Sequence, residues 1–127
     1  MLGVGPERFE QLMGQAVDDL PEWIAEHMQN VYITFAAWPT NHQMRAARVG
    51  RGGMLLGLYE GVPLSRRGRG YHLAPPDRIT LFQRPLEIVA RDEADLVDRI
   101  QRTIIHEIAH HFGFSEDELG RLEGRGG

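Results

Sequence analysis

The sequence contains no cysteine, and all fourteen of its basic residues are arginine, so lysine is absent as well. Without cysteine the chain can form neither disulfides nor thiolate metal sites, and a metal ion would have to be bound by histidine and carboxylate side chains. No segment has the roughly 20 consecutive apolar residues that a membrane-spanning helix needs. The first residues also lack the basic and apolar segments of a signal peptide. We therefore expect a cytoplasmic protein with no membrane partner.

The composition is that of a globular protein, with 42% hydrophobic and 25% charged residues over a length of 127. A chain of this length can bury one core, and we expect a single domain over residues 1–127. The net charge is −4, but the charge is uneven, because residues 41–85 carry eight arginines against two acidic residues. This basic middle segment would attract an acidic peptide or a nucleic acid, or it is an arginine-covered loop surface.

Hydrophobic periodicity predicts the order helix, strand, strand, strand, long helix, short helix. We expect an N-terminal helix, a long helix near the C-terminus that carries the chemistry, and a short last helix. Asp92 is placed to cap the long helix, whose predicted buried face ends at Phe112. The predicted elements are a helix over 6–20, a short helix over 21–28, strands over 31–36, 54–61 and 78–83, a short helix over 86–90, the long helix over 93–112 and a last helix over 115–122.

Two histidines four residues apart, His106 and His110, fall on the long predicted helix with Glu107 beside the first. Side chains at positions i and i+4 leave a helix from the same face, one turn apart, so two imidazoles can share one metal ion. Neutral imidazole suits Zn²⁺, and Glu107 is placed to act as a general base for a metal-bound water. The alternative interpretation is a solvated polar face of an amphipathic helix.

A catalytic zinc usually takes three protein ligands and leaves a fourth position for water. Gly113 predicts a left-handed residue that ends the helix and returns the chain toward the metal. Glu116 then stands six residues after His110, where the long metzincin pattern has its third ligand, and Asp117 is the alternative. We expect His111 to have a structural role or to support a metal ligand, and His27 to face solvent. Tyr71, His72 or a neighbouring arginine is a candidate for an oxyanion or substrate contact.

These residues carry a resemblance to the small bacterial zincin-like metallopeptidases, also called minimal metalloprotease-like proteins. The resemblance spans most of the chain and rests on residues 56–64, on residues 77–82 and above all on residues 103–113. It implies an α+β zincin-like fold with a small mixed sheet of three to four strands. It also implies a zinc site at His106 and His110, Glu107 as the base, and a carboxylate as the third ligand. The sequence departs from true metzincins because that ligand is not histidine and all five methionines precede the motif, so no Met-turn follows it.

The function favoured by these patterns is zinc-dependent hydrolysis of peptide bonds in a peptide or protein substrate, bound along an edge strand. Residues 54–60 or 78–83 are the candidate edge strands. Two alternatives stay open at this point. One is a metal-dependent ribonuclease, which the basic segment favours and the net charge of −4 and Glu107 argue against. The other is a non-catalytic zinc-binding module. The sequence indicates neither the substrate nor the oligomeric state.

Overall fold

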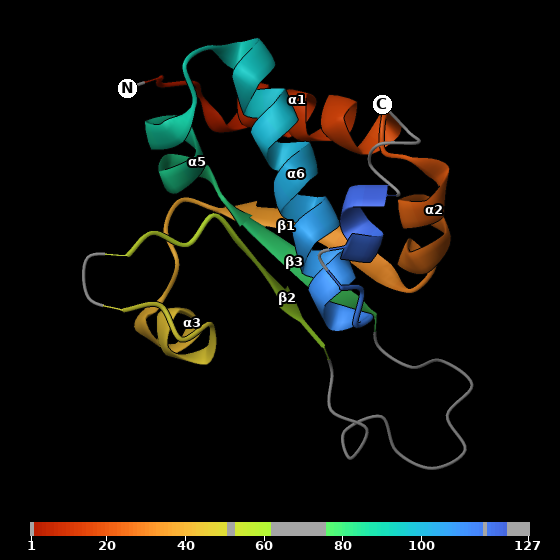
Figure 1. Ribbon diagram of the computed structural model, residues 1–127. Coiled ribbons are helices and arrows are strands. Elements are labelled where there is room, and N and C mark those ends of the chain that lie inside the picture. The colour runs from red at the N-terminus through yellow and green to blue at the C-terminus, as the bar shows by residue number, and fades with distance from the viewer. Residues whose placement is uncertain (1, 51–52, 62–75, 116, 122–127) are drawn as a thin grey trace.

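The computed structural model describes residues 2–50, 53–61, 76–115 and 117–121 (Figure 1). It confirms the α+β class, the N-terminal helix, the mixed sheet and the long helix. The elements, in chain order, are α1 (Pro6–Asp18), α2 (Glu22–Ala25), the 3-10 turn η1 (Glu26–Met28), β1 (Val31–Ala36), α3 (Asn41–Ala46), β2 (Gly57–Glu60), β3 (Asp77–Phe82), α5 (Gln83–Val89) and α6 (Glu93–His111), and residues 117–121 are helical.

The sheet has the strand order β1-β3-β2, with β3 in the centre. β1 runs parallel to β3, so that Ile33 lies opposite Ile79, whereas β2 runs antiparallel to β3, so that Gly57 lies opposite Leu81. This order makes β2 an edge strand of the described sheet. The predicted strand over 78–83 is therefore central, and its backbone bonds to strands on both sides.

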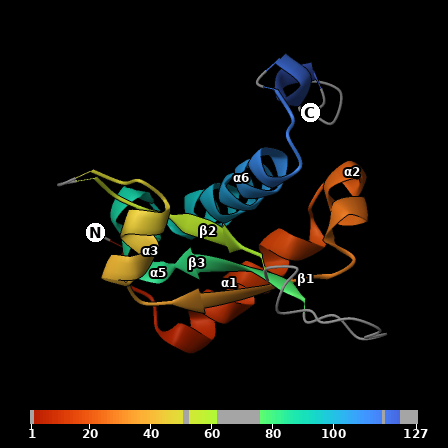
Figure 2. The same ribbon diagram turned by 90° about the horizontal axis from the view of Figure 1, so that it is seen from below.

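Helices α1 and α6 cross each other over one face of the sheet, while α3 lies apart from them (Figures 1 and 2). Their apolar faces meet the sheet, and the side-chain amide of Gln101 on α6 donates to the carbonyl oxygen of Ala16 on α1 at 3.1 Å. Burial of this apolar surface is what fixes α6 on the sheet. The largest buried apolar side chains are Phe9, Phe82, Leu12, Ile24, Ile79, Leu81, Leu86, Leu96, Ile100, Ile104 and Ile108.

Local signals fix where α6 begins. The Asp92 carboxylate accepts a hydrogen bond from the backbone N–H of Asp95 at 2.8 Å, which confirms the predicted N-cap. The carboxylate of Asp95 in turn accepts from the backbone N–H of Arg91 at 2.9 Å and from Nε of Arg99 at 3.0 Å. The Arg91 bond, followed by the Arg99 bond, holds the pKa of Asp95 below its ordinary value.

The end of α6 is fixed by Gly113, which has φ of +79° as predicted. The N–H of Phe114 donates to the carbonyl of Ala109 at 2.8 Å, and the N–H of Gly113 donates to that of His110 at 3.3 Å. These two bonds form a Schellman motif, in which a left-handed residue satisfies the last helical carbonyls. Ser115 follows as the predicted cap of the last helix, with reciprocal hydrogen bonds to Glu118 of 3.1 and 3.3 Å.

Two expectations about burial near this end are wrong. Phe112 is 46% exposed, because α6 ends at His111 and the buried face does not extend past the helix. His27 is half-buried rather than solvent-facing, since its ring packs edge-on against Phe112 and Phe114, and its Nδ1 lies 2.7 Å from the carbonyl oxygen of Trp23. This contact could not be predicted from the sequence, because it joins residues more than 80 positions apart in the chain.

Strand β2 and helix α6 approach each other closely at Gly57. A Cβ atom added there would lie 2.6 Å from Cγ2 of Thr103 and 3.3 Å from the carbonyl oxygen of Thr80. Real side chains do not come so close, so this position requires glycine for lack of space rather than for an unusual φ. Among the described residues, no helix has the length and apolar character needed to cross a membrane.

We predict that Gly57→Ala lowers the free energy of unfolding by about 1–3 kcal/mol, because the added methyl group overpacks the contact between β2 and α6. Urea unfolding measures the effect. Gly14→Ala is the matched control, since a Cβ on this α1 glycine meets nothing within 4 Å and alanine favours a helix by about 0.5–1 kcal/mol. Thr103→Ser should partly rescue Gly57→Ala, and equal loss with and without it would contradict the contact.

A second prediction concerns pH. Because the folded-state pKa of Asp95 is lowered from its ordinary value of 3.8, its stabilising contribution is present above that value and is lost as the pH falls below it. Asp95→Asn should therefore cost more stability at about pH 6 than at about pH 3, as measured by urea unfolding. Asp98→Asn is the control, because its ion pair with Arg102 is on the surface. A cost for Asp95→Asn that is the same at both pH values would show that the carboxylate charge is not what stabilises.

Candidate metal centre

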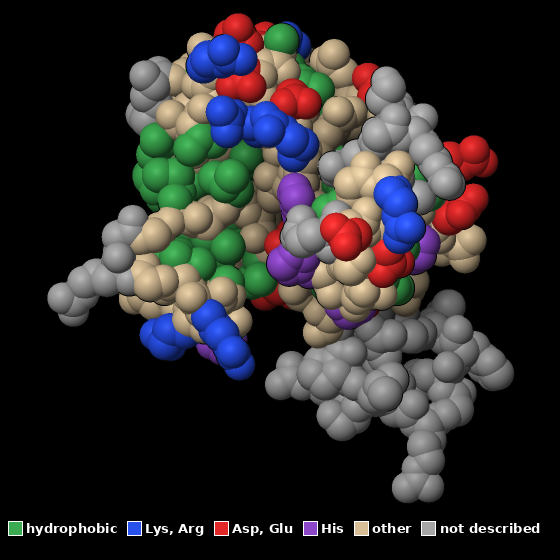
Figure 3. Space-filling view, in the orientation of Figure 1, with side chains coloured by type: hydrophobic (Ala, Val, Ile, Leu, Met, Phe, Trp, Pro, Cys, Tyr) green, Lys and Arg blue, Asp and Glu red, His purple; other side chains and the backbone are tan. Residues whose placement is uncertain are grey.

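Two adjoining hollows lie between β2 and α6, and both are lined by Leu55, Gly57 and Glu107. His106, His110 and His111 line this groove, and Figure 3 shows a row of arginine side chains above the histidines near the middle of the molecule. The edge strand and the segment that leads into it form one wall, and the exposed face of the long helix forms the other. The further lining residues are Leu56, Arg99, Arg102, Thr103 and His106 in one hollow, and Ala47, Leu58, Tyr59, His110 and His111 in the other.

Glu107 lies where the two hollows meet, half-buried between helix and strand. Its Oε1 accepts a hydrogen bond from the backbone N–H of Tyr59 on β2 at 2.7 Å. Burial raises the pKa of the Glu107 carboxyl, and this effect outweighs the Tyr59 bond and the nearby His110 and His106, which act in the opposite direction. A carboxylate with a raised pKa in a groove is a better proton acceptor than one in water, and it is the environment expected of a general base.

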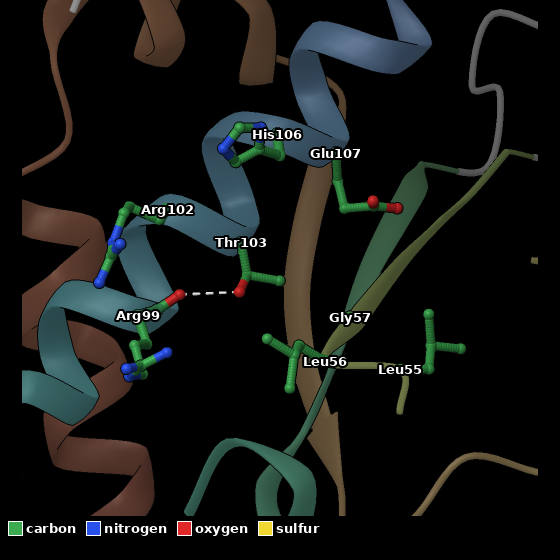
Figure 4. Close-up of a pocket in the computed structure, with 8 residues that line it drawn as sticks. All are labelled: Leu55, Leu56, Gly57, Arg99, Arg102, Thr103, His106 and Glu107. Carbon is green, nitrogen blue, oxygen red and sulfur yellow. Dashed lines mark hydrogen bonds between the residues drawn. The ribbon is translucent and has the colours of Figure 1, made fainter. Parts of the chain in front are cut away.

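His106 and His110 are both exposed, one on each side of Glu107 along the helix, and each borders one of the two hollows. In Figure 4 the side chain of Glu107 points toward the strand, whereas that of His106 leaves the helix in a different direction. Both residues of the i,i+4 pair lie within the helix, as the sequence predicts, since α6 ends at His111, one residue after His110. Two imidazoles are therefore presented to solvent on one helical face beside a partly buried carboxylate.

The third predicted ligand, Glu116, is outside the described residues. Asp117, the alternative, is described and exposed, but it forms no group with the two histidines. Within residues 2–50, 53–61, 76–115 and 117–121, no three His, Asp or Glu side chains come together in a way that could hold a metal ion. Tyr71 and His72, the candidates for an oxyanion or substrate contact, also lie outside the described part of the chain.

Tyr59 has a role at the groove that the sequence did not indicate. Its ring stacks on that of His111, with the ring centroids 3.8 Å apart and the planes 15° apart, and its hydroxyl donates to Oδ2 of Asp77 at 2.7 Å. Together with the bond from its N–H to Glu107, Tyr59 thus contacts α6 at two positions. The position of His111 is consistent with the structural role expected for it, although it packs on the strand and not on the core.

Arg99 and Arg102 also line the groove, and sequence reasoning missed them. A signal was available, because they precede His106 by seven and four residues. On a helix that turns about 100° per residue, these spacings place both arginines within about 40° of His106 around the helix axis. The stripe that carries the histidines therefore continues toward the N-terminus of α6 as two arginines.

Comparison with known proteins gives three findings. A solved structure of a conserved hypothetical protein from Thermo thermophilus matches with a TM-score of 0.52 and 22% sequence identity, over 95% of this chain and 99% of that one, which is a likeness of fold alone. No curated protein matches the sequence. The family described as zincin-like metallopeptidase matches residues 28–125, a range that contains both walls of the groove and the whole histidine motif. The chain therefore belongs to the zincin-like metallopeptidase family.

Proposed function

We propose that the protein is a zinc-dependent peptidase that hydrolyses a peptide bond in the groove between β2 and α6. The observation that carries this proposal is the position of Glu107, a carboxylate of raised pKa that lies between two exposed histidines and is bonded to an edge strand. Family membership supports the same reaction class. A polar helix face without function would leave Glu107 in water, whereas here it is half-buried against the strand.

The donor set fits zinc. His106 and His110 supply two imidazoles, and the chain contains no thiolate that would favour another kind of site. The left-handed turn at Gly113 reverses the chain directly after the helix, which supports Glu116 as the third ligand. Asp117, one residue further along the chain, is the alternative carboxylate.

A zinc ion held there would supply a water of lowered pKa and would polarise the scissile carbonyl. The chain's own contribution is to accept and pass on a proton. Oε1 of Glu107 is held by the N–H of Tyr59, which leaves Oε2 to take the proton of the attacking water. The raised pKa favours this acceptor, and the same carboxyl can then donate the proton to the leaving amine.

The substrate is proposed to lie extended along β2, because β3 is central and, of the two candidate strands, β2 is the one at the edge of the described sheet and beside the groove. Successive residues of a strand direct their backbone groups to alternate edges. The N–H of Tyr59 donates to Glu107, so the N–H of Gly57, two residues earlier, is on the same edge of β2. The carbonyl oxygen of Leu56 is on the opposite edge, where it accepts from the N–H of Phe82 on β3. Gly57 can therefore pair with the backbone of a bound peptide.

Replacing Glu107 by alanine should abolish cleavage and leave zinc bound. We expect a loss of at least about 100-fold in kcat, the usual size of a general-base contribution, with an unchanged ratio of zinc to chain. Cleavage of a mixed set of synthetic peptides, read by mass spectrometry, measures the first quantity. Glu10→Ala, at an exposed position on α1, is the control. Unchanged cleavage by Glu107→Ala would remove this residue from the mechanism.

Zinc content should distinguish the two adjacent histidines at the end of α6. His110→Ala should lose most of the bound zinc, whereas His111→Ala should retain it, because the ring of His111 is stacked on Tyr59. Plasma mass spectrometry after removal of free metal gives the content per chain. The reverse result would exchange the roles of the two residues. Zinc in the wild type without cleavage of peptides would favour a non-catalytic zinc-binding module, and cleavage of RNA would favour a nuclease.

A further inference from the structure

Two guanidinium groups lie at one end of the groove, beside the proposed catalytic residues. Arg99, Arg102, Thr103 and His106 all line the same hollow, and Leu55 and Leu56 form its opposite side (Figure 4). The hollow therefore combines two guanidinium groups, each paired with one aspartate, with an apolar wall, and the Glu107 carboxylate lines it as well. This combination suits a group that carries a carboxylate at the end of a short apolar stem.

The two arginines are held in place by contacts that leave donors available. Arg99 is bound through Nε by Asp95, and its two Nη atoms carry four further N–H groups. Asp95 is itself fixed by the N–H of Arg91, so that Arg99 is held by a rigid partner. Arg102 is bound through Nη2 by Asp98 at 2.6 Å, and both of these side chains are more than half exposed. Arg99 is thus the anchored donor of the hollow and Arg102 is the adaptable one.

The spacing gives the distance from the reacting bond. Along a helix with a rise of 1.5 Å per residue, Arg102 lies about 6 Å and Arg99 about 10 Å before His106. A peptide extended along β2 advances about 3.4 Å per residue. A side chain that reaches the two arginines therefore belongs to a residue about two or three positions from the scissile bond, on the side that passes Leu55 and Leu56.

From this arrangement we propose that the hollow is a subsite for a carboxylate of the substrate, with Arg99 and Arg102 as the specificity-determining residues. This inference depends on the proposed function for its substrate, a peptide lying on β2. The carboxylate has two possible sources, an aspartate or glutamate side chain or the C-terminus of the peptide. In both, the leucines pack on the apolar part and the guanidinium groups bind the oxygens.

The test uses a library of synthetic peptides about 12 residues long and of mixed sequence, long enough to span β2 and the hollow at about 3.4 Å per residue. One half has free and the other amidated C-termini. Zinc-loaded Glu107→Ala protein is immobilised, so that peptides bind without being cut, and the bound peptides are identified by mass spectrometry. We expect peptides with Asp or Glu to be enriched about 10-fold over those with Asn or Gln in the amidated half. Arg102→Glu, in the same background, should abolish the enrichment.

Arg8→Glu is the matched control. Arg8 and Glu93 form an exposed ion pair of 2.6 Å, like that of Arg102 and Asp98, but Arg8 does not line the hollow. Circular dichroism and zinc content establish that each variant is folded and loaded. Arg99→Gln is a second variant from the same hollow and should act in the same direction as Arg102→Glu. Enrichment that depends on a free C-terminus, and on Arg102, would support the subsite and identify the terminal carboxylate as its ligand.

Three outcomes would overturn the subsite. The first is no preference for a carboxylate of either source, neither for Asp or Glu over Asn or Gln nor for a free over an amidated C-terminus. The second is a preference that survives Arg102→Glu, and the third is Arg102-dependent binding of a short RNA in place of peptides. Cleavage by the wild-type protein is measured separately on the same library. If the preference is present without any cleavage, the peptidase proposal fails and the subsite stands. If there is cleavage without the preference, the subsite fails and the peptidase proposal stands.

Discussion

The hydrogen bond between the N–H of Tyr59 and the carboxylate of Glu107 joins the two walls of the groove. It forms only because β2 approaches α6 closely, and that approach depends on the missing side chain at Gly57, where Thr103 fills the space. The bond places the proposed base half inside the protein, where burial raises its pKa. The same contact between β2 and α6 therefore determines both how the helix packs on the strand and how far the pKa of Glu107 is raised.

The edge position of β2 gives this contact its functional meaning. An edge strand has backbone groups that can pair with another chain. In this protein that edge faces the histidine-bearing side of α6, so a peptide added to the sheet would pass the histidines and the two arginines in turn. The N-cap at Asp92 and the turn at Gly113 fix the two ends of α6. They thereby fix where along the helix the histidines and the two arginines lie.

Features that depend on neighbouring residues could be predicted from the sequence. The cap at Asp92, the left-handed Gly113 and the reciprocal bonds of Ser115 and Glu118 each involve residues within a few positions of one another. The bond between Tyr59 and Glu107 spans 48 positions and requires the strand order, which periodicity does not give. For the same reason the sequence predicts 78–83 as a candidate edge strand, although this strand is central. Phe112 is predicted in the core because the helical spacing of apolar residues extends to it, whereas α6 ends at His111.

The central claim is that His106 and His110 share one zinc ion whose remaining positions are a carboxylate and water. X-ray absorption at the zinc edge of the zinc-loaded protein tests it directly. The account predicts two imidazole nitrogens at about 2.0–2.1 Å and oxygen atoms in the remaining positions. A zinc ion with all four positions filled by protein groups would contradict an open catalytic site, and a zinc ion without imidazole ligands would contradict the site as a whole.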